Sequence, residues 1–418
     1  MTLYLEISPL QEAQFTGVSV VTERLADHLL RRLGDDLRFF LRNRVVPRPA
    51  VEALIEQKSG GHLRETVAAL DAPCAPLDPT RFSYALFPHH KTAPGAFTHE
   101  AQIIHDFSTV LTPQFQRPET IARQAPAFRS EIWSNHTTFC VSRATLDDAA
   151  LYFDAERRTR LKVLSLGCDW DPAFVEASEA HRYGGAKPYV LVLATLEPRK
   201  NIDVLLRAIA ADPDLLERYD FLFLGRAGWG EGVSEKLGRF DLAHRYEAGL
   251  YFPGFVSEFA KYVLLKNAHL VVYPSIFEGF GLPVLEALSL GKHVLTSISS
   301  SLTEVGGEAC EYFDPNFPDQ FPAALRSALG RAEAEPFNEA ALIQASLFSW
   351  ERAAGAILED YEEAAERVAG PAGASPAPAS DARALEAEAP AARDGAAQEG
   401  AAREENEQDA EAEASHAG

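Results

Sequence analysis

The chain has 418 residues, which is enough for two domains of ordinary size. Hydrophobic residues make up 46% of the sequence and charged residues 24%, which is typical of a globular protein. Its 39 Lys and Arg residues against 61 Asp and Glu residues give a formal net charge of −22. That charge argues against a nucleic-acid partner, because a phosphate backbone requires a basic surface. The four cysteines form no C-x-x-C pair, so neither a zinc knuckle nor a disulfide framework is indicated.

Short apolar runs alternate with amphipathic stretches, the pattern of a parallel α/β sheet. The first series predicts strands at 2–8, 37–43, 83–88, 101–107, 137–142 and 161–167, with helices over 19–33 and from about 144. After a turn-rich stretch at 181–188, the second series predicts strands at 188–195, 219–228, 250–256, 269–275 and 293–299, with helices over 201–211 and 350–368. The pattern therefore predicts two doubly wound, Rossmann-like domains that face a cleft, at 1–180 and 181–368.

The segment 369–418 differs in composition, since it repeats Ala, Glu and Pro and contains no aromatic residue. It holds eleven acidic residues against three arginines, so it carries −8 of the net charge. Such a segment cannot bury enough apolar surface to offset its ordering entropy, and we expect a disordered tail.

The segment EGFGLPVLE at 278–286 follows an apolar strand and opens a helix. Its glycines allow a ligand to approach the backbone, and the N–H groups of Gly281 and Leu282 would form an anion site at the helix N-terminus. Glu278 and Glu286 can face the same pocket, which predicts hydrogen bonds to sugar and ribose hydroxyls beside a phosphate. A plain glycine turn with one surface glutamate and one capping glutamate is the alternative.

Two further segments predict phosphate contacts at helix N-termini. EPRKN at 197–201 lies between a buried strand and a helix, where Arg199 and Lys200 would neutralise a diphosphate. Gly17 would let the first domain approach the same phosphate. Taken singly, the Arg199–Lys200 pair is more typical of a solvated loop, and a glycine such as Gly17 is more typical of an ordinary turn.

Together, EPRKN, EGFGLPVLEAL (278–288), VLTSISSSLTEVGGEA (294–309) and FSW (348–350) resemble the retaining nucleotide-sugar glycosyltransferases of family four, within glycosyl transferases group 1. The likeness is weaker over the first domain, at TG (16–17) and IHD (104–106). It implies a GT-B fold and metal-independent, retaining transfer of a hexose, mannose as a first guess, from a nucleotide diphosphate sugar. The implied acceptor is a glycan or a lipid-linked glycan of bacterial surface polysaccharide synthesis. No cofactor is implied, because the nucleotide sugar is a substrate.

The resemblance also implies roles for individual residues. Glu278 and Glu286 match the glutamates of an E-x-seven-E motif, which contact the donor sugar and the ribose respectively. Ala194 stands where some members carry an additional arginine. The implied catalytic residues are His105, Glu278, Arg199 and Lys200. The implied donor-binding residues are Gly17, Arg199, Lys200, Val256, Glu278, Gly279, Phe280, Gly281, Leu282 and Glu286.

Two other functions stay open. The first is a GT-B epimerase that acts on a nucleotide sugar, and the second is a catalytically silent sugar-nucleotide-binding partner protein. The pairing of EPRKN with EGFGLPVLE resembles transferases rather than epimerases. Retention of Glu278, Arg199, Lys200 and His105 argues against a silent binder.

Some other patterns carry weaker signals. Asp169-Trp170-Asp171 has the spacing of a metal-binding D-x-D pair, but it lies in the linker between the domains, so we expect no metal there. We interpret His89, His90 and His99 as loop histidines, one of which could touch the acceptor.

The first domain is locally basic over residues 31–48. Its arginines are either solvated flanks around Asp35 and Asp36 or a peripheral contact with the inner face of a membrane. We expect a cytoplasmic protein, because no signal peptide or membrane-spanning run is apparent. The arginines in question are Arg31, Arg32, Arg38, Arg42, Arg44 and Arg48.

Overall fold

The computed structural model describes residues 2–12, 15–42, 44–57, 82–181, 185 and 187–369. The acidic segment expected to be a disordered tail lies outside the described residues, apart from its first residue. None of the described helices is both long enough and apolar enough to cross a bilayer.

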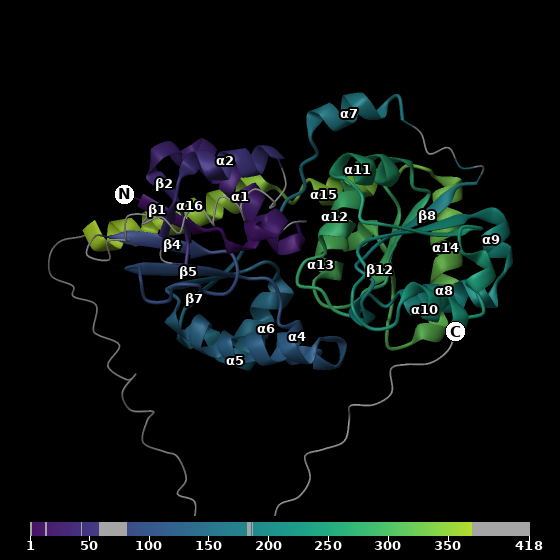
Figure 1. Ribbon diagram of the computed structural model, residues 1–418, viewed down its shortest axis with the longest axis horizontal. Helices are drawn as coiled ribbons and strands as arrows, with labels where there is room; N and C mark the ends of the chain where they lie inside the picture. The colour runs from purple at the N-terminus through teal and green to yellow at the C-terminus, as the bar shows by residue number, and fades with distance from the viewer. Residues whose placement is uncertain are drawn as a thin grey trace, which may run out of the picture. The chain divides into compact units, whose positions relative to one another are not determined.

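Within the described residues, seven strands form the first sheet, in the order β3-β2-β1-β4-β5-β6-β7 (Figure 1). Every neighbouring pair is parallel except β2 and β3. The strand order reverses between β1 and β4, so a ligand crevice is expected at the carboxyl ends there. The strands are β1 (Thr2–Glu6), β2 (Leu37–Leu41), β3 (Arg44–Val46), β4 (Ser83–Phe87), β5 (His99–Ile104), β6 (Thr137–Cys140) and β7 (Arg160–Val163).

The helices connected to this sheet are amphipathic. In α1, for example, Leu25 and Leu29 lie one turn apart on the inner face, and both are fully buried. The helices are α1 (Gly17–Leu33), α2 (Arg48–Gln57), α4 (Ser108–Leu111), α5 (Pro118–Ser134) and α6 (Arg143–Phe153).

The second sheet has the order β10-β9-β8-β11-β12-β13, and all its described pairs are parallel. Its order reverses between β8 and β11, and these are the two strands that precede EPRKN and EGFGLPVLE. The two predicted motifs therefore meet at one switch point. The strands are β8 (Tyr189–Leu193), β9 (Asp220–Leu224), β10 (Leu250–Gly254), β11 (Leu270–Tyr273), β12 (Val294–Ser297) and β13 (Glu311–Phe313).

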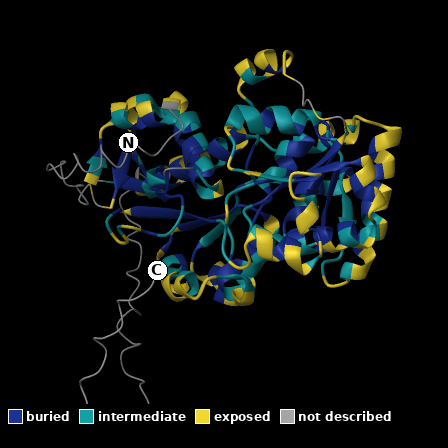
Figure 2. Cartoon of the chain, turned by 45° about the vertical axis from the view of Figure 1, so that its right-hand side comes forward, coloured by how far each residue is buried: buried dark blue, intermediate teal, exposed yellow. Residues whose placement is uncertain are grey.

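The inner strands β4, β5, β6, β8, β9, β11 and β12 are buried along their whole length, the edge strands are less so, and exposed residues gather on the outward faces of the helices (Figure 2). This layering confirms the two doubly wound units expected from the sequence. The helices of the second half are α7 (Pro172–Ser178), α8 (Ile202–Ala211), α9 (Asp214–Arg218), α10 (Val233–Arg239), α11 (Glu258–Asn267), α12 (Leu282–Leu288), α13 (Leu302–Gly306), α14 (Phe321–Ala334), α15 (Glu339–Ala345) and α16 (Trp350–Ala369).

The final helix, α16, has polar contacts with the first sheet through Asp360 and Glu363, although the sequence grouped it with the second domain. It lies beside α1 (Figure 1). Its Asp360 is fully buried, accepts a hydrogen bond from the Tyr84 hydroxyl (2.8 Å) and lies 3.0 Å from Arg160 and from Lys162. Burial opposes ionisation of Asp360, but these partners and His99 lower its pKa well below the usual range. A buried acid on the last helix thus ties that helix to β4 and β7 of the first sheet.

Several elements were not predicted. Strands β3 and β13 have only three residues each, which is too short for a recognisable alternation of apolar and polar residues. Helix α5 contains Pro126 in its interior and buries only Phe128 and Ile132, which weakens both its propensity and its apolar stripe. These elements depend on packing against the sheets rather than on local pattern.

Candidate active site

The carboxylate of Glu278 is the centre of a cluster at the switch point of the second sheet. Lys200 lies in a short helical turn, Pro198–Lys200, after β8, and its Nζ donates to Glu278 Oε1 at 2.6 Å. The Nη1 atom of Arg199 lies 3.0 Å from Oε2. The hydroxyls of Tyr273, the last residue of β11, and Ser275 also donate to Oε1. Both carboxylate oxygens of Glu278 are therefore engaged within the chain.

Burial and charge act in opposite directions in this cluster. Glu278 is only 8% exposed, and burial opposes its ionisation, but the charges of Arg199 and Lys200 outweigh this and lower its pKa to about 2. Burial lowers the pKa of Lys200, while Glu278 opposes that shift. The arrangement keeps Glu278 ionised at every ordinary pH.

The loop that carries Glu278 is fixed on two sides. The hydroxyls of Ser300 and Ser301, after β12, donate to the Glu278 carbonyl at 2.7 and 2.9 Å. On the other side, Arg199 Nη1 donates to the Phe277 carbonyl at 2.6 Å. Gly281 has φ 109°, and a Cβ there would stand 2.7 Å from a Leu302 methyl group, so glycine is required. The loop is therefore held rigidly before α12 begins.

The first half of the chain meets this loop at Gly279. A Cβ on Gly279 would stand 1.6 Å from the carbonyl oxygen of His105, which follows β5. The Thr145 hydroxyl donates to the Gly279 carbonyl at 3.2 Å. The side chain of His105 lies with Nε2 2.7 Å from the Pro88 carbonyl, which can only accept, so Nε2 carries the proton. Burial lowers the pKa of His105, which favours the neutral imidazole.

Glu286 lies on α12, the helix that follows the Glu278 loop, and it has a different partner from Glu278. Its Oε1 accepts from Lys261 of α11 at 2.8 Å. Burial raises the pKa of Glu286, and the Lys261 charge only partly offsets this. Lys261 also lies 5.4 Å from the ring centroid of Trp170, in the linker between the two halves. Glu286 is thus held from a neighbouring helix and not by the basic pair.

Most of the other residues predicted to bind the nucleotide-sugar donor lie around these two glutamates. Phe280 is buried and meets Phe348, of the FSW segment, edge to face with ring centroids 5.6 Å apart. Leu282 and Val256 are partly buried against the same core. Gly17 is exposed at the start of α1, with no atom within 4 Å of where a Cβ would stand. The structure thus brings His105, Arg199, Lys200 and the Glu278 loop together, whereas Gly17 has no described contact with them.

Sequence reasoning missed the residues that support the two glutamates. The strand end YPS at 273–275 and the serine run at 299–301 were visible, but only their position after adjacent strands indicates a role. Lys261 carries no motif signal. The missed residues are Thr145, Trp170, Lys261, Tyr273, Ser275, Ser300 and Ser301.

The weaker sequence signals resolve into structural roles. Asp171 of the D-x-D pair accepts from the Ala173 N–H and caps α7. His99 stacks on Tyr84, with ring centroids 4.8 Å apart, and lies in the core rather than in a loop. His90 lies 3.0 Å from Glu131.

Several arginines of the basic segment 31–48 form ion pairs within the chain. Arg31 contacts Asp27 and Arg32 contacts Glu351, while Arg48 contacts Asp35 and Glu52. For Arg31, Arg32 and Arg48, these pairs favour the interpretation as solvated flanking residues rather than a membrane contact.

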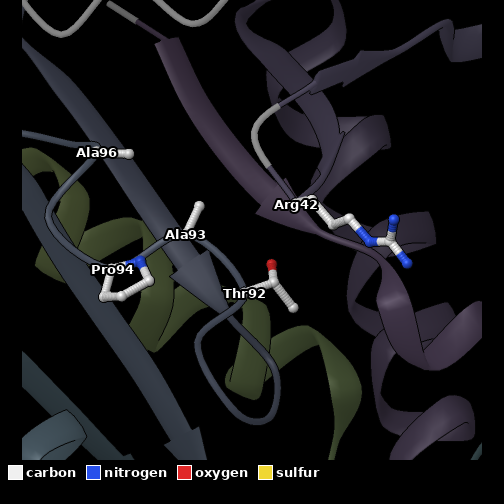
Figure 3. Close-up of a pocket in the computed structure, with 5 residues that line it drawn as sticks. All are labelled: Arg42, Thr92, Ala93, Pro94 and Ala96. Carbon is white, nitrogen blue, oxygen red and sulfur yellow. The ribbon is translucent and has the colours of Figure 1, made fainter. Parts of the chain in front are cut away.

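An open hollow in the first half lies apart from the cluster. It is lined by Arg42, at the end of β2, and by the loop residues Thr92, Ala93, Pro94 and Ala96 (Figure 3). None of the predicted site residues lines it. We assign the chemistry to the Glu278 cluster instead, because buried charges with displaced pKa values gather there.

The comparisons with known proteins identify the family of the chain. Residues 176–341 match the family model of glycosyl transferases group 1. The chain is 30% identical over 267 residues to O-antigen chain mannosyltransferase B of Escherichia coli, a match that covers 62% of this chain and 68% of that protein.

Solved structures extend the likeness to the whole fold. Sucrose-phosphate synthase from Thermosynechococcus elongatus has a TM-score of 0.63 at 16% identity, over 88% of this chain and 100% of that one. HepE from Anabaena, solved in complex with UDP and glucose, has a TM-score of 0.57 at 17% identity, over 87% and 100%. These likenesses confirm the GT-B fold expected from the sequence.

Proposed function

Because this chain belongs to the glycosyl transferases of group 1 and is a glycosyltransferase, we propose that it transfers mannose from a nucleotide diphosphate sugar to a glycan or lipid-linked acceptor in bacterial surface polysaccharide synthesis. The name of the Escherichia coli relative supports the sugar and the pathway class. The UDP and glucose in the HepE structure support a nucleotide-sugar donor. The epimerase and the silent binder are not favoured.

The observation that carries the proposal is the convergence of Arg199, Lys200 and Glu278 at a switch point beside His105. Two cations at this point can neutralise the charge that develops on a departing diphosphate. The Nε–H of Arg199 is buried without a partner among the described residues, so one donor of the pair is still unused. The Oε2 atom of the ionised Glu278, whose described partner is Arg199 alone, would accept a hydrogen bond from a sugar hydroxyl in addition. Arg199 and Lys200 therefore neutralise the diphosphate, and Glu278 orients the sugar.

We propose retention at the anomeric carbon. The bond to the diphosphate breaks, the sugar develops oxocarbenium character, and the acceptor hydroxyl attacks from the same face. A leaving phosphate oxygen takes the acceptor proton, so no protein base is required. His105, neutral and held through Nε2, would lie beside the donor sugar. The proposal includes neither a cofactor nor a metal, because the two cations take the role of countercharge.

The donor is tested first by binding. Thermal shifts of the full chain with GDP-mannose, and with UDP-, ADP- and CMP-sugars, are followed by donor hydrolysis and by transfer to a mannose-ended acceptor. We expect GDP-mannose to stabilise the protein and to be consumed at equal rates with and without EDTA. No shift with any nucleotide sugar would refute the donor site, and loss of turnover in EDTA would refute metal independence.

Lys200→Ala tests the basic pair directly. Loss of one charge-assisted contact should weaken donor binding by roughly tenfold or more. Arg207→Ala is the matched control, because Arg207 is exposed on the helix that follows Lys200. Unchanged donor affinity in Lys200→Ala would contradict its role.

We further propose a cytoplasmic location with a peripheral contact at the inner membrane face through the exposed Arg38 and Arg42. The protein should sediment with anionic liposomes at low salt, and Arg38→Ala with Arg42→Ala should release it. Failure of the wild-type protein to sediment would refute the contact.

A further inference from the structure

The two carboxylate oxygens of Glu286 are in different situations. Its Oε1 accepts from Lys261 at 2.8 Å. Among the described residues Oε2 has no hydrogen-bond partner, and it is not one of the polar atoms sealed from solvent. Glu286 thus has one oxygen held by Lys261 and one oxygen without a partner among the described residues.

Lys261 is itself held from several directions. Its Nζ lies 3.2 Å from Glu258, one turn earlier on α11, and 5.4 Å from the Trp170 ring centroid. The Trp170 indole N–H donates to Ser289 Oγ at 2.8 Å, and that hydroxyl donates to the Glu286 carbonyl at 2.7 Å. The same tryptophan therefore supports both the lysine and the helix that carries the glutamate.

We propose that Lys261 is a positioning residue for donor binding: it holds one oxygen of Glu286 so that the other stays open to the ribose hydroxyls of the nucleotide. This inference rests on the proposed function. An ionised carboxylate accepts hydrogen bonds and repels phosphate, so its open oxygen fits a vicinal diol rather than a diphosphate.

The charges around Glu286 explain why a fixed cation is needed. The charged and titratable groups that face it are Lys261 and Glu258 on α11, Arg24 on α1 and Cys168 in the linker. Burial raises the pKa of Glu286, and Lys261 is the strongest influence in the opposite direction. Without Lys261, the carboxyl group would take up a proton at a higher pH and become a poorer acceptor.

The test compares two nucleotides on the same protein. Calorimetric titrations of the full chain use GDP and 2′,3′-dideoxy-GDP, with the corresponding UDP pair alongside. Lys261→Met should weaken GDP binding by roughly tenfold and leave dideoxy-GDP binding unchanged, because only ribose hydroxyls contact the open oxygen. Lys266→Met is the matched control on the same helix, since Lys266 pairs with Glu179 and Ser178.

A pH series adds a readout that a merely structural role would not move. The affinity of Lys261→Met divided by that of the wild type should rise between about pH 6 and about pH 8 as Glu286 ionises in the variant. The ratio removes the ionisation of the nucleotide's own phosphate, which titrates near about pH 6 in both proteins. Glu286→Gln combined with Lys261→Met should bind GDP no more weakly than Glu286→Gln alone.

Each outcome bears on one claim. An equal loss for GDP and dideoxy-GDP, or no loss, would overturn the role of Lys261 while leaving the donor site intact. If the wild-type protein bound neither GDP nor UDP, the proposed function would fail as well. If Lys261→Met did not fold, Lys261→Gln, which keeps a donor but removes the charge, would provide the same comparison.

Discussion

Glu278 and Glu286 belong to one short motif, yet the fold treats them differently. Glu278 has both oxygens engaged by four side chains, and its pKa falls to about 2. Glu286 has one oxygen held by Lys261, and burial raises its pKa. A shared motif therefore contains one carboxylate that is part of a fixed charge network and one that keeps an acceptor open. The following predictions separate these two roles.

The largest effect is expected for Glu278→Gln. Removing this charge takes away the carboxylate shared by Arg199 and Lys200 and leaves Glu197, 2.8 Å from Arg199, as their remaining shared acidic partner. The unfolding free energy should fall by about 3 kcal/mol. Turnover should fall by roughly a hundredfold, because the cations are no longer oriented. Chemical denaturation and donor consumption measure the two effects, and a stable variant with normal turnover would contradict the network.

The contribution of Glu278 to stability should depend on pH and be lost in acid. Its folded pKa of about 2 lies below its ordinary value of 4.5, so its stabilising contribution is complete above the ordinary value and is lost as the pH falls towards the folded one. The difference in unfolding free energy between wild type and Glu278→Gln should therefore shrink over that interval. A difference that stayed constant in acid would be inconsistent with the paired carboxylate.

Gly279→Ala tests the contact between the two halves next to Glu278. The new Cβ would overlap the His105 carbonyl, which is backbone and cannot yield cheaply. We expect a loss of about 2 kcal/mol in stability and a larger relative loss in turnover than in nucleotide affinity. Gly238→Ala, where a Cβ meets nothing within 4 Å, is the control and should be tolerated.

Glu286→Gln should act on binding rather than on folding. GDP affinity should fall by roughly tenfold, since a neutral amide is a weaker acceptor for ribose hydroxyls than a carboxylate. The unfolding free energy should change by no more than about 1 kcal/mol. A stability loss as large as that of Glu278→Gln would erase the distinction between the two glutamates.

The smallest effect is expected for Tyr273→Phe. This change removes one of the donors to Glu278 and leaves the ionic partners, so the cost should be about 1 kcal/mol. Nucleotide affinity measured by calorimetry should be unchanged. A loss of affinity would show that the Tyr273 hydroxyl contacts the ligand as well.

Much of the fold could be predicted because local pattern encodes it. The buried runs of β8 and β11 and the helices that follow them indicate a parallel sheet, and that topology alone places EPRKN and EGFGLPVLE together. The support of Glu278 could not be predicted in the same way. Ser300 and Ser301 reach it from the next strand, and no local pattern states which carbonyl a serine will bind.

The sequence by itself determined the two doubly wound units and identified Arg199, Lys200, Glu278 and Glu286 as candidate site residues. It also placed Glu278 in a loop and Glu286 on the helix that follows. Only the tertiary structure decided that Arg199 and Lys200 are paired with Glu278, that Lys261 holds Glu286, and that Asp360 ties the last helix to the first sheet. The physical reason is that periodicity and composition specify which residues are buried. The partner of a buried charge depends on which strands and helices become neighbours in space.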